Sequence, residues 1–293
     1  MKKLLLLALA IQPVLSHAEE NLFGYVKGAE PMPNGAREIK QVITSRQDKG
    51  AGYYNAMNYS TEFEAGITDR FTATAALNLQ GIDTHGIRID AYIPQDEKYS
   101  LKFSGVEGSV KYNFLSAAAN PIGISSYSSI NIGVLDAHSG LDKNTYSFEQ
   151  FLLLQKYMMD GQLVWAGNVG IEATHATRKE VANLPAGFEW PVHPEMEIAL
   201  QLATGLSYRV APNWYVGAET VYSSEFETEV GQERWSVFAG PSVHFGDEKW
   251  WVTATWLPQI RGGKSTFPEQ DDKNLQLIER TKNEYRLKVG FNF

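Results

Sequence analysis

The last nine residues of the chain, 285–293, alternate between apolar and polar side chains without interruption. Successive side chains of a β-strand point to opposite faces, so this segment predicts a strand with one apolar and one polar side. An apolar outer face and a polar inner face suit a strand of a membrane β-barrel, and the last strand of a soluble β-sandwich is the alternative. The apolar positions are Tyr285, Leu287, Val289, Phe291 and Phe293, and the polar positions are Arg286, Lys288, Gly290 and Asn292.

The first residues have the features of a secretory signal peptide. Lys2 and Lys3 precede an apolar run over residues 4–11, and residues 16–18 read Ser-His-Ala, a small-x-small cleavage site. We therefore expect residues 1–18 to be a signal peptide that is cleaved after Ala18 when the protein is exported. The chain contains no cysteine, so neither a lipid-anchored cysteine nor a disulfide framework is expected.

Composition narrows the class of protein further. No later segment has the 18 or so consecutive apolar residues that a transmembrane helix needs. The mean hydropathy of −0.28 still fits a barrel, because only alternate residues of a barrel strand face lipid. The formal net charge is −8, and removal of Lys2 and Lys3 makes it more negative by two, which argues against a nucleic-acid partner.

Segments of period-two alternation recur along residues 38–293. Residues 19–37 contain two prolines and three glycines and are expected to form an irregular periplasmic segment. The remainder predicts an antiparallel up-and-down transmembrane β-barrel of about 12 strands. The expected strands are 38–46, 54–67, 70–80, 103–114, 123–135, 145–158, 162–174, 195–209, 214–226, 232–245, 249–258 and 281–293.

The predicted connections alternate in length. Residues 68–69, 160–161, 211–213 and 246–248 are short and rich in turn-forming residues, whereas residues 81–102, 136–144, 175–194 and 259–280 are long. Short periplasmic turns and longer extracellular loops are typical of outer-membrane barrels, and an even strand number places both termini in the periplasm. Aromatic residues gather near both strand ends, which predicts two girdles at the bilayer interfaces.

Charged residues on the polar faces are predicted to point into the lumen, because each would cost several kcal/mol in lipid near the midplane. Barrel closure places the last strand beside the first, so we expect Arg286 and Lys288 to interact with Glu62 or Glu64, with Lys40 nearby. Both a structural ion-pair network and the lining of a pore are consistent with this pattern. The predicted lumen-facing residues are Glu62, Glu64, Glu107, Lys111, Glu172, Glu197, Arg209, Glu219, Arg234, Arg286 and Lys288.

Three loop segments are candidates for functional sites, and none of them predicts a catalytic, cofactor or metal site. His138 and Ser139 lie in segment 136–140, but adjacent strand residues point to opposite faces and do not form a base–nucleophile pair. Segment 188–194 contains Phe188 and Trp190, is stiffened by two prolines, and suits loop packing or ligand binding at the mouth. The pair Asp271 and Asp272 is most simply a solvated acidic pair. No cofactor-binding motif is present.

The final strand also resembles the C-terminal signal strand of Gram-negative outer-membrane barrels. That resemblance implies that the barrel-assembly machinery is a partner, and that it reads Tyr285, Leu287, Val289, Phe291 and Phe293. As a whole, the chain resembles an uncharacterised family of proteobacterial outer-membrane barrel proteins. The matching stretches are 24–30, 107–114, 187–191, 227–241, 256–263 and the final strand. This resemblance implies a location in the outer membrane and supplies no activity.

The leading hypothesis is an outer-membrane barrel, in contact with lipid, that either passes a small solute or is plugged and structural. An outer-membrane hydrolase acting on lipid and a soluble secreted β-sandwich that binds a ligand are the alternatives. The pattern indicates no oligomeric state.

Overall fold

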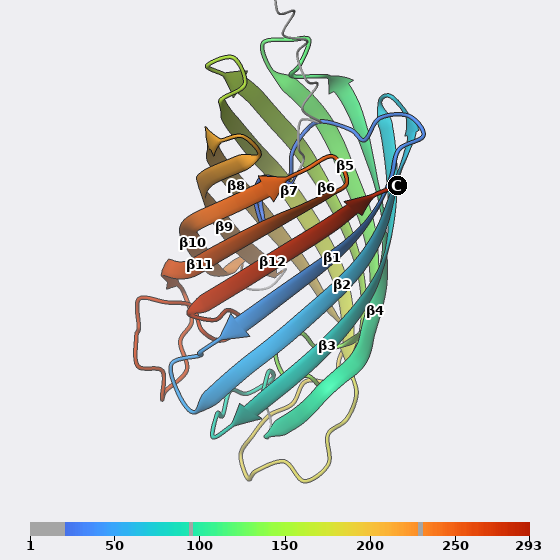
Figure 1. Cartoon of the computed structure of the whole chain (residues 1–293). Helices are drawn as coiled ribbons and strands as arrows, with labels where there is room; N and C mark the ends of the chain where they lie inside the picture. Colours follow the sequence, from blue (N-terminus) through green and yellow to red (C-terminus); the bar gives the residue numbers. More distant parts are fainter. Residues whose placement is uncertain (1–20, 94–95, 228–230) are drawn as a thin grey trace, which may run out of the picture.

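The computed structural model describes residues 21–93, 96–227 and 231–293, and they form one closed antiparallel barrel (Figure 1). Consecutive strands are neighbours all around the wall, and β1 pairs with β12 to close it. The described residues include no helix with the length and apolarity to cross a bilayer. The strands are β1 (Arg37–Gln47), β2 (Tyr53–Thr68), β3 (Phe71–His85), β4 (Glu97–Leu115), β5 (Gly123–Leu135), β6 (Asp142–Met158), β7 (Leu163–Arg178), β8 (Glu195–Ala211), β9 (Trp214–Glu227), β10 (Gly231–Gly246), β11 (Trp250–Gly263) and β12 (Asn283–Asn292).

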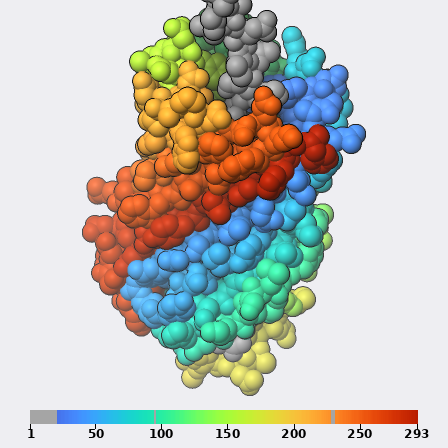
Figure 2. Space-filling view, viewed as in Figure 1, coloured from blue at the N-terminus to red at the C-terminus, as the bar shows by residue number. Residues whose placement is uncertain are grey.

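Closure of the barrel confirms the predicted fold class. The register of β1 on β12 runs from Glu38 opposite Asn292 to Gln47 opposite Asn283. In the space-filling view, the red β12 lies directly against the blue β1 (Figure 2). A backbone bond from the Phe293 N–H to the Arg37 carbonyl, 3.0 Å, extends the pairing to the last residue. Because the wall has no free edge, every strand has two neighbours, as a membrane-spanning sheet requires.

Several strands extend further than predicted, among them β4 and β11. β4 starts at Glu97, where the sequence suggested a loop, because polar and apolar residues still alternate there despite the charges. β11 continues to Gly263, beyond Pro258. Pro258 lies where the β10–β11 pairing is interrupted, between the pairs Phe238–Gln259 and Ser242–Thr255. Pro241 lies in the same interruption, and a proline costs least where the ladder lacks a hydrogen bond.

The strands have an apolar outer face and a polar inner face. Large apolar side chains stay exposed on the outside, for example Ile130 (59%), Ile171 (54%) and Phe291 (53%). Their inward neighbours are buried, for example Ser129 (3%). Such an exposed apolar belt is unfavourable in water and favourable in hydrocarbon. Aromatic rings meet at the end with the short turns, where Phe245 lies 5.0 Å from both Trp214 and Trp250 between ring centroids.

Residues 21–31 of the N-terminal segment lie inside the barrel, which corrects their predicted periplasmic position, and residues 33–35 are exposed beside the β2–β3 turn. The segment has no helix or strand, as expected, but its residues Leu22, Phe23 and Val26 are buried against the inner wall. In Figure 1 it appears as the dark blue trace that passes within the barrel and then joins β1. Its contacts are with strands far away in the sequence, so no local pattern reveals them. We call residues 21–31 the plug.

Candidate functional site

The plug is held by one buried carboxylate on β9. Glu219, 1% exposed, accepts hydrogen bonds from three consecutive backbone N–H groups, those of Gly24 (2.8 Å), Tyr25 (2.8 Å) and Val26 (3.0 Å). The Thr255 hydroxyl donates a fourth bond of 2.8 Å. Bonds to an ionised acceptor are about twice as strong as neutral ones, and a buried carboxylate needs several. A side chain at Gly24 would lie 2.7 Å from the Thr255 oxygen, so the approach requires glycine.

Other side chains of the wall bind the backbone of the plug in place of a β-ladder. Asn168 of β7 accepts from the Lys27 N–H (2.7 Å) and donates to the Lys27 carbonyl (2.8 Å). The Gln155 amide oxygen accepts from the Ala29 N–H (2.8 Å), and Lys111 donates to the Glu30 carbonyl (2.7 Å). The irregular segment thus satisfies its backbone polar groups without secondary structure, as buried backbone must.

Apolar contacts complete the seat of the plug. Phe23 is 2% exposed and packs where Gly205 leaves space, since a Cβ at Gly205 would lie 2.6 Å from the Phe23 ring. Burial of each such side chain stabilises the plugged state by about 1.5–3 kcal/mol. The buried cluster around the plug is Leu22, Phe23, Val26, Val164, Ala166, Ala203, Tyr215, Val221, Phe238 and Leu257.

Arg286 and Lys288 bind the plug. They line a small cavity beside it together with Glu62 and Glu64, and the charges of Lys288 and Glu62 attract each other, but among the described residues no ion pair within 4.0 Å joins these basic side chains to the two carboxylates. Arg286 donates to Thr44 (2.9 Å) and to the Gly24 carbonyl (3.2 Å), and Lys288 donates to the Phe23 carbonyl (3.2 Å). Within the described residues, the ion-pair partner of Glu62 (2.9 Å) and Glu64 (3.5 Å) is Lys40. Lys40 lies on β1 directly opposite Glu62, between the other two strands, so it is the nearer cation.

The end of the barrel with the long loops is closed by a second apolar cluster. Leu277 of the β11–β12 loop (residues 264–282) is fully buried in it. Beneath this loop, the fully buried Lys49 donates to three of its carbonyls, those of Leu277 (3.4 Å), Ile278 (2.7 Å) and Arg280 (3.1 Å). The cluster comprises Tyr54, Ala56, Ile82, Ile87, Ile89, Ile93, Phe267, Leu275 and Leu277.

Arg234 is the charged centre of this closed end. Its guanidinium lies 2.8 Å from Glu279 of the β11–β12 loop and 3.3 Å from Glu225 of β9, and it also pairs with Glu233. It is 3% exposed, so these contacts are barely screened by water. Burial by itself raises the pKa of the Glu279 carboxyl, but Arg234 and further neighbours hold that pKa well below its usual range.

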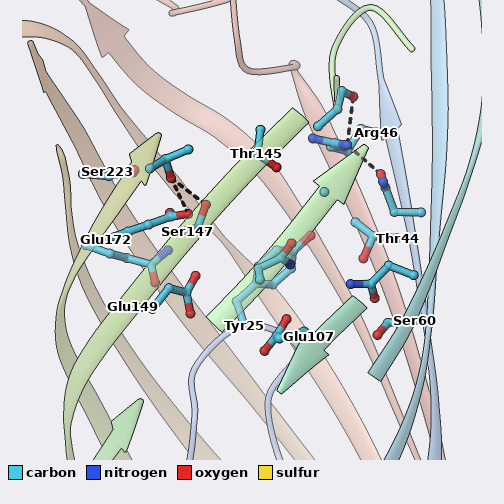
Figure 3. Close-up of a pocket in the computed structure, with 18 of the residues that line it drawn as sticks. Tyr25, Thr44, Arg46, Ser60, Glu107, Thr145, Ser147, Glu149, Glu172 and Ser223 are labelled. Carbon is cyan, nitrogen blue, oxygen red and sulfur yellow. Dashed lines mark hydrogen bonds between the residues drawn. The ribbon is translucent and has the colours of Figure 1, made fainter. Parts of the chain in front are cut away.

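Between the plug and the closed end lies a chamber of about 700 Å³. Figure 3 shows Tyr25 of the plug together with Glu107, Glu149 and Glu172 of the wall around it. Among the described residues, nine carboxylates and five Lys or Arg side chains line it, so it favours cations and polar molecules. A smaller cavity of about 120 Å³ lies beside the plug.

All eleven charged residues that were predicted to face the lumen lie on inward positions. Glu62, Glu107, Glu172 and Glu197 line the chamber, together with Arg286. The other six lie elsewhere on the inner face. Glu64 and Lys288 line the smaller cavity, Lys111 and Glu219 contact the plug, Arg234 lies in the closed end, and Arg209 shares the face of the buried Ser207.

Several residues of the chamber were not predicted. Glu149 of β6 precedes Phe151 and Leu153, which point inward, and Leu152, which points outward, so both faces of that part of the strand are apolar and alternation gave no direction. Lys27 and Arg280 lie outside the strands, where periodicity carries no signal. They share no signal in the sequence, since Lys27 follows the apolar Tyr25 and Val26 whereas Arg280 lies among charged residues.

The three weighed loop segments have structural contacts. The Asp136 carboxylate accepts from the backbone N–H groups of His138 (2.8 Å) and Ser139 (2.7 Å), and the Ser139 hydroxyl accepts from Leu141 (3.3 Å). Among the described residues, no hydrogen bond joins the His138 ring to Ser139, so the segment lacks a base–nucleophile pair there. The Trp190 indole donates to the Lys179 carbonyl within its own loop (2.9 Å).

Asp271, from the weighed acidic pair, forms an exposed ion pair with Lys282 (2.7 Å). This contact lowers the pKa of the Asp271 carboxyl.

Lys49 makes docking of the β11–β12 loop dependent on pH. Burial, aided by Arg46, lowers the pKa of the Lys49 ammonium to about 7. A free lysine keeps its proton to about pH 10.4, so the docked state binds fewer protons and is favoured as pH rises from about 7. We expect protease cleavage within residues 264–282 to slow between about pH 6 and about pH 9 in folded protein. Lys49→Met should abolish this dependence, and equal slopes in both proteins would contradict it.

Comparisons with known proteins identify a family and similar structures for this chain. The model of the family of unknown function DUF6662 matches residues 15–293. No curated protein sequence matches the chain. The chain is similar to the COG4313 outer membrane channel from Pseudomonas putida F1, with a TM-score of 0.57 and 10% identity over 90% of this chain and 98% of that one. It is also similar to the β domain of the Bordetella autotransporter Brka, with a TM-score of 0.54 and 11% identity over 89% and 100%.

At such low identities the two structures show the fold alone, and it is the fold of outer-membrane barrels. The family model covers nearly the whole chain, including the plug and all twelve strands. The chain therefore belongs to the family of unknown function DUF6662.

Proposed function

We propose that this protein is an outer-membrane channel for small polar solutes that its own plug keeps closed at rest. The short turns then face the periplasm and the long loops face the exterior, with the apolar belt in the lipid. The observation that carries the proposal is the Glu219 carboxylate, which binds three consecutive N–H groups of the plug and so holds the plug inside the lumen.

A purely structural barrel needs no enclosed polar chamber. A packed interior would be filled by side chains, as in small barrels. Here about 700 Å³ remain open between two closures that use different parts of the chain. The plug is attached to the wall by hydrogen bonds and apolar contacts and shares no ladder with it, so it can leave without breaking the barrel. A lumen with a removable barrier is the arrangement that a gated channel requires.

Glu219→Gln tests the proposal. The amide keeps the shape, but it loses the charge and turns an N–H₂ group towards the N–H donors of the plug. Loss of a charged hydrogen-bonding partner costs about 1.5–3 kcal/mol, so the open state gains about tenfold or more in population. We expect more frequent single-channel openings in a planar bilayer than for the parent protein.

Glu248→Gln, in the exposed turn between β10 and β11, is the matched control and should behave like the parent. Heat-modifiable gel mobility shows whether each barrel is folded. A folded Glu219→Gln barrel that never conducts would contradict the channel and favour a plugged structural barrel.

A further inference from the structure

The plug carries a lysine that projects into the chamber. Lys27 is held at its backbone by both amide atoms of Asn168, so its side chain has a defined origin. The Lys27 ammonium lies 4.5 Å from the centroid of the Tyr127 ring and 5.8 Å from that of Phe151. Ammonium groups bind aromatic faces at such distances, more strongly where water is excluded.

Carboxylates surround this aromatic corner. The Tyr127 hydroxyl donates to Glu107 (3.0 Å), and the Ser129 hydroxyl donates to Glu149 (3.0 Å). Burial alone would lower the pKa of the Lys27 ammonium, but Tyr127, Glu149, Glu107 and Glu62 raise it overall. The corner therefore favours a protonated amine.

The same wall carries more negative charge than Lys27 neutralises. Glu149 and Glu172 lie directly opposite each other on β6 and β7. Like charges in that position destabilise a sheet. Within the described residues, Glu107, Glu149 and Glu172 form no ion pair with Lys or Arg within 4.0 Å, and their hydrogen bonds come from hydroxyls. A cation in the chamber would relieve this repulsion, and the cavity has room for one beyond Lys27.

We propose that Tyr127, Phe151, Glu107 and Glu149 form a binding subsite for primary aliphatic amines, which Lys27 occupies when the plug is seated. An incoming alkylammonium group then competes with Lys27 for the same rings and carboxylates. Glu172 offers a further carboxylate for a second ammonium group, so a short diamine should bind better than a monoamine.

Competition between an incoming amine and Lys27 at this subsite couples binding of the solute to release of the plug. A ligand that binds only where Lys27 has left shifts the protein towards the released plug, by the difference in its affinity for the two states. The reciprocal effect is that Lys27 weakens amine binding. The inference rests on the proposed channel for its role in gating, but the subsite itself is testable without any conduction.

Lys27→Met isolates the subsite, because it keeps the chain length and removes the ammonium. We expect isothermal titration calorimetry of the full mature chain in detergent to show 1,4-diaminobutane binding about tenfold or more tightly to Lys27→Met than to the parent. Adding Glu149→Gln to Lys27→Met should reverse that gain. Lys156→Met, which removes an exposed lysine outside the chamber, should bind like the parent.

Two results would overturn the subsite. One is a folded Lys27→Met barrel, verified by heat-modifiable mobility, that binds no diamine. The other is unchanged binding after Glu149→Gln, which would place the amine elsewhere. Neither depends on channel activity: diamine binding without conductance would refute only the gate, and conductance without diamine binding would refute only the subsite.

Discussion

Deleting residues 21–31 should remove the barrier at the short-turn end of the barrel permanently and raise its conductance. The deletion removes every plug contact described above at once, including the three N–H donors of Glu219 and the buried Phe23. All twelve strands and the β1–β12 closure remain, since β1 begins at Arg37. We expect the mean current in a planar bilayer to rise on the order of tenfold or more, because the closed state loses its plug and the docked β11–β12 loop is the barrier that remains.

The wall should survive the deletion with lower stability. The plug contributes much of the apolar packing at this end of the lumen, and each lost large side chain is worth about 1.5–3 kcal/mol. We expect the heat-modifiable form to persist but to convert at a lower temperature. Phe23→Ala is the graded control and should fall between parent and deletion in both current and stability. A folded deletion that stays closed would place the barrier at the β11–β12 loop instead.

The wall of this barrel could be predicted from the sequence because its signal is local. The alternation over residues 285–293 is set by neighbours in the chain, and so are the short turns. The same alternation gave the inward direction of Glu219 and Arg234. The inner face of β6 was not predicted, because the apolar side chains of Phe151 and Leu153 point inward there.

The contents of the lumen could not be predicted because they depend on contacts between distant segments. Gly24 and Glu219 are 195 residues apart, and Lys49 meets Ile278 across 229 residues. No periodic pattern or motif in the sequence indicates either contact. The bonds from Arg286 and Lys288 to the plug were not predicted for the same reason: nothing in the sequence showed that plug carbonyls would lie within reach of these side chains.

Replacing Arg234 with methionine should open the other end of the barrel. Arg234 faces Glu225, Glu233 and Glu279, and without it the ion pair of these carboxylates that is left among the described residues is that of Glu225 with Arg280. Removing one partner of a buried ion pair costs about 3–5 kcal/mol, since it leaves charge buried without compensation. We expect the β11–β12 loop to undock and residues 264–282 to become sensitive to protease at pH 7.

Below about pH 6, where the Lys49 ammonium keeps its proton in the docked state as well, the pH dependence should reverse sign in this variant. In the parent, Glu279 has a pKa held well below its usual range, so docking is stable above that range and weakens as acid protonates the carboxylate. Without Arg234, burial and the neighbouring carboxylates favour the protonated acid, so acid should restore docking. Arg209→Met, an inward arginine at the opposite end, is the control and should keep the pattern of the parent. If protection in Arg234→Met also fell with acid, the carboxylates would not depend on Arg234, and the closed end would have to be held by its apolar cluster alone.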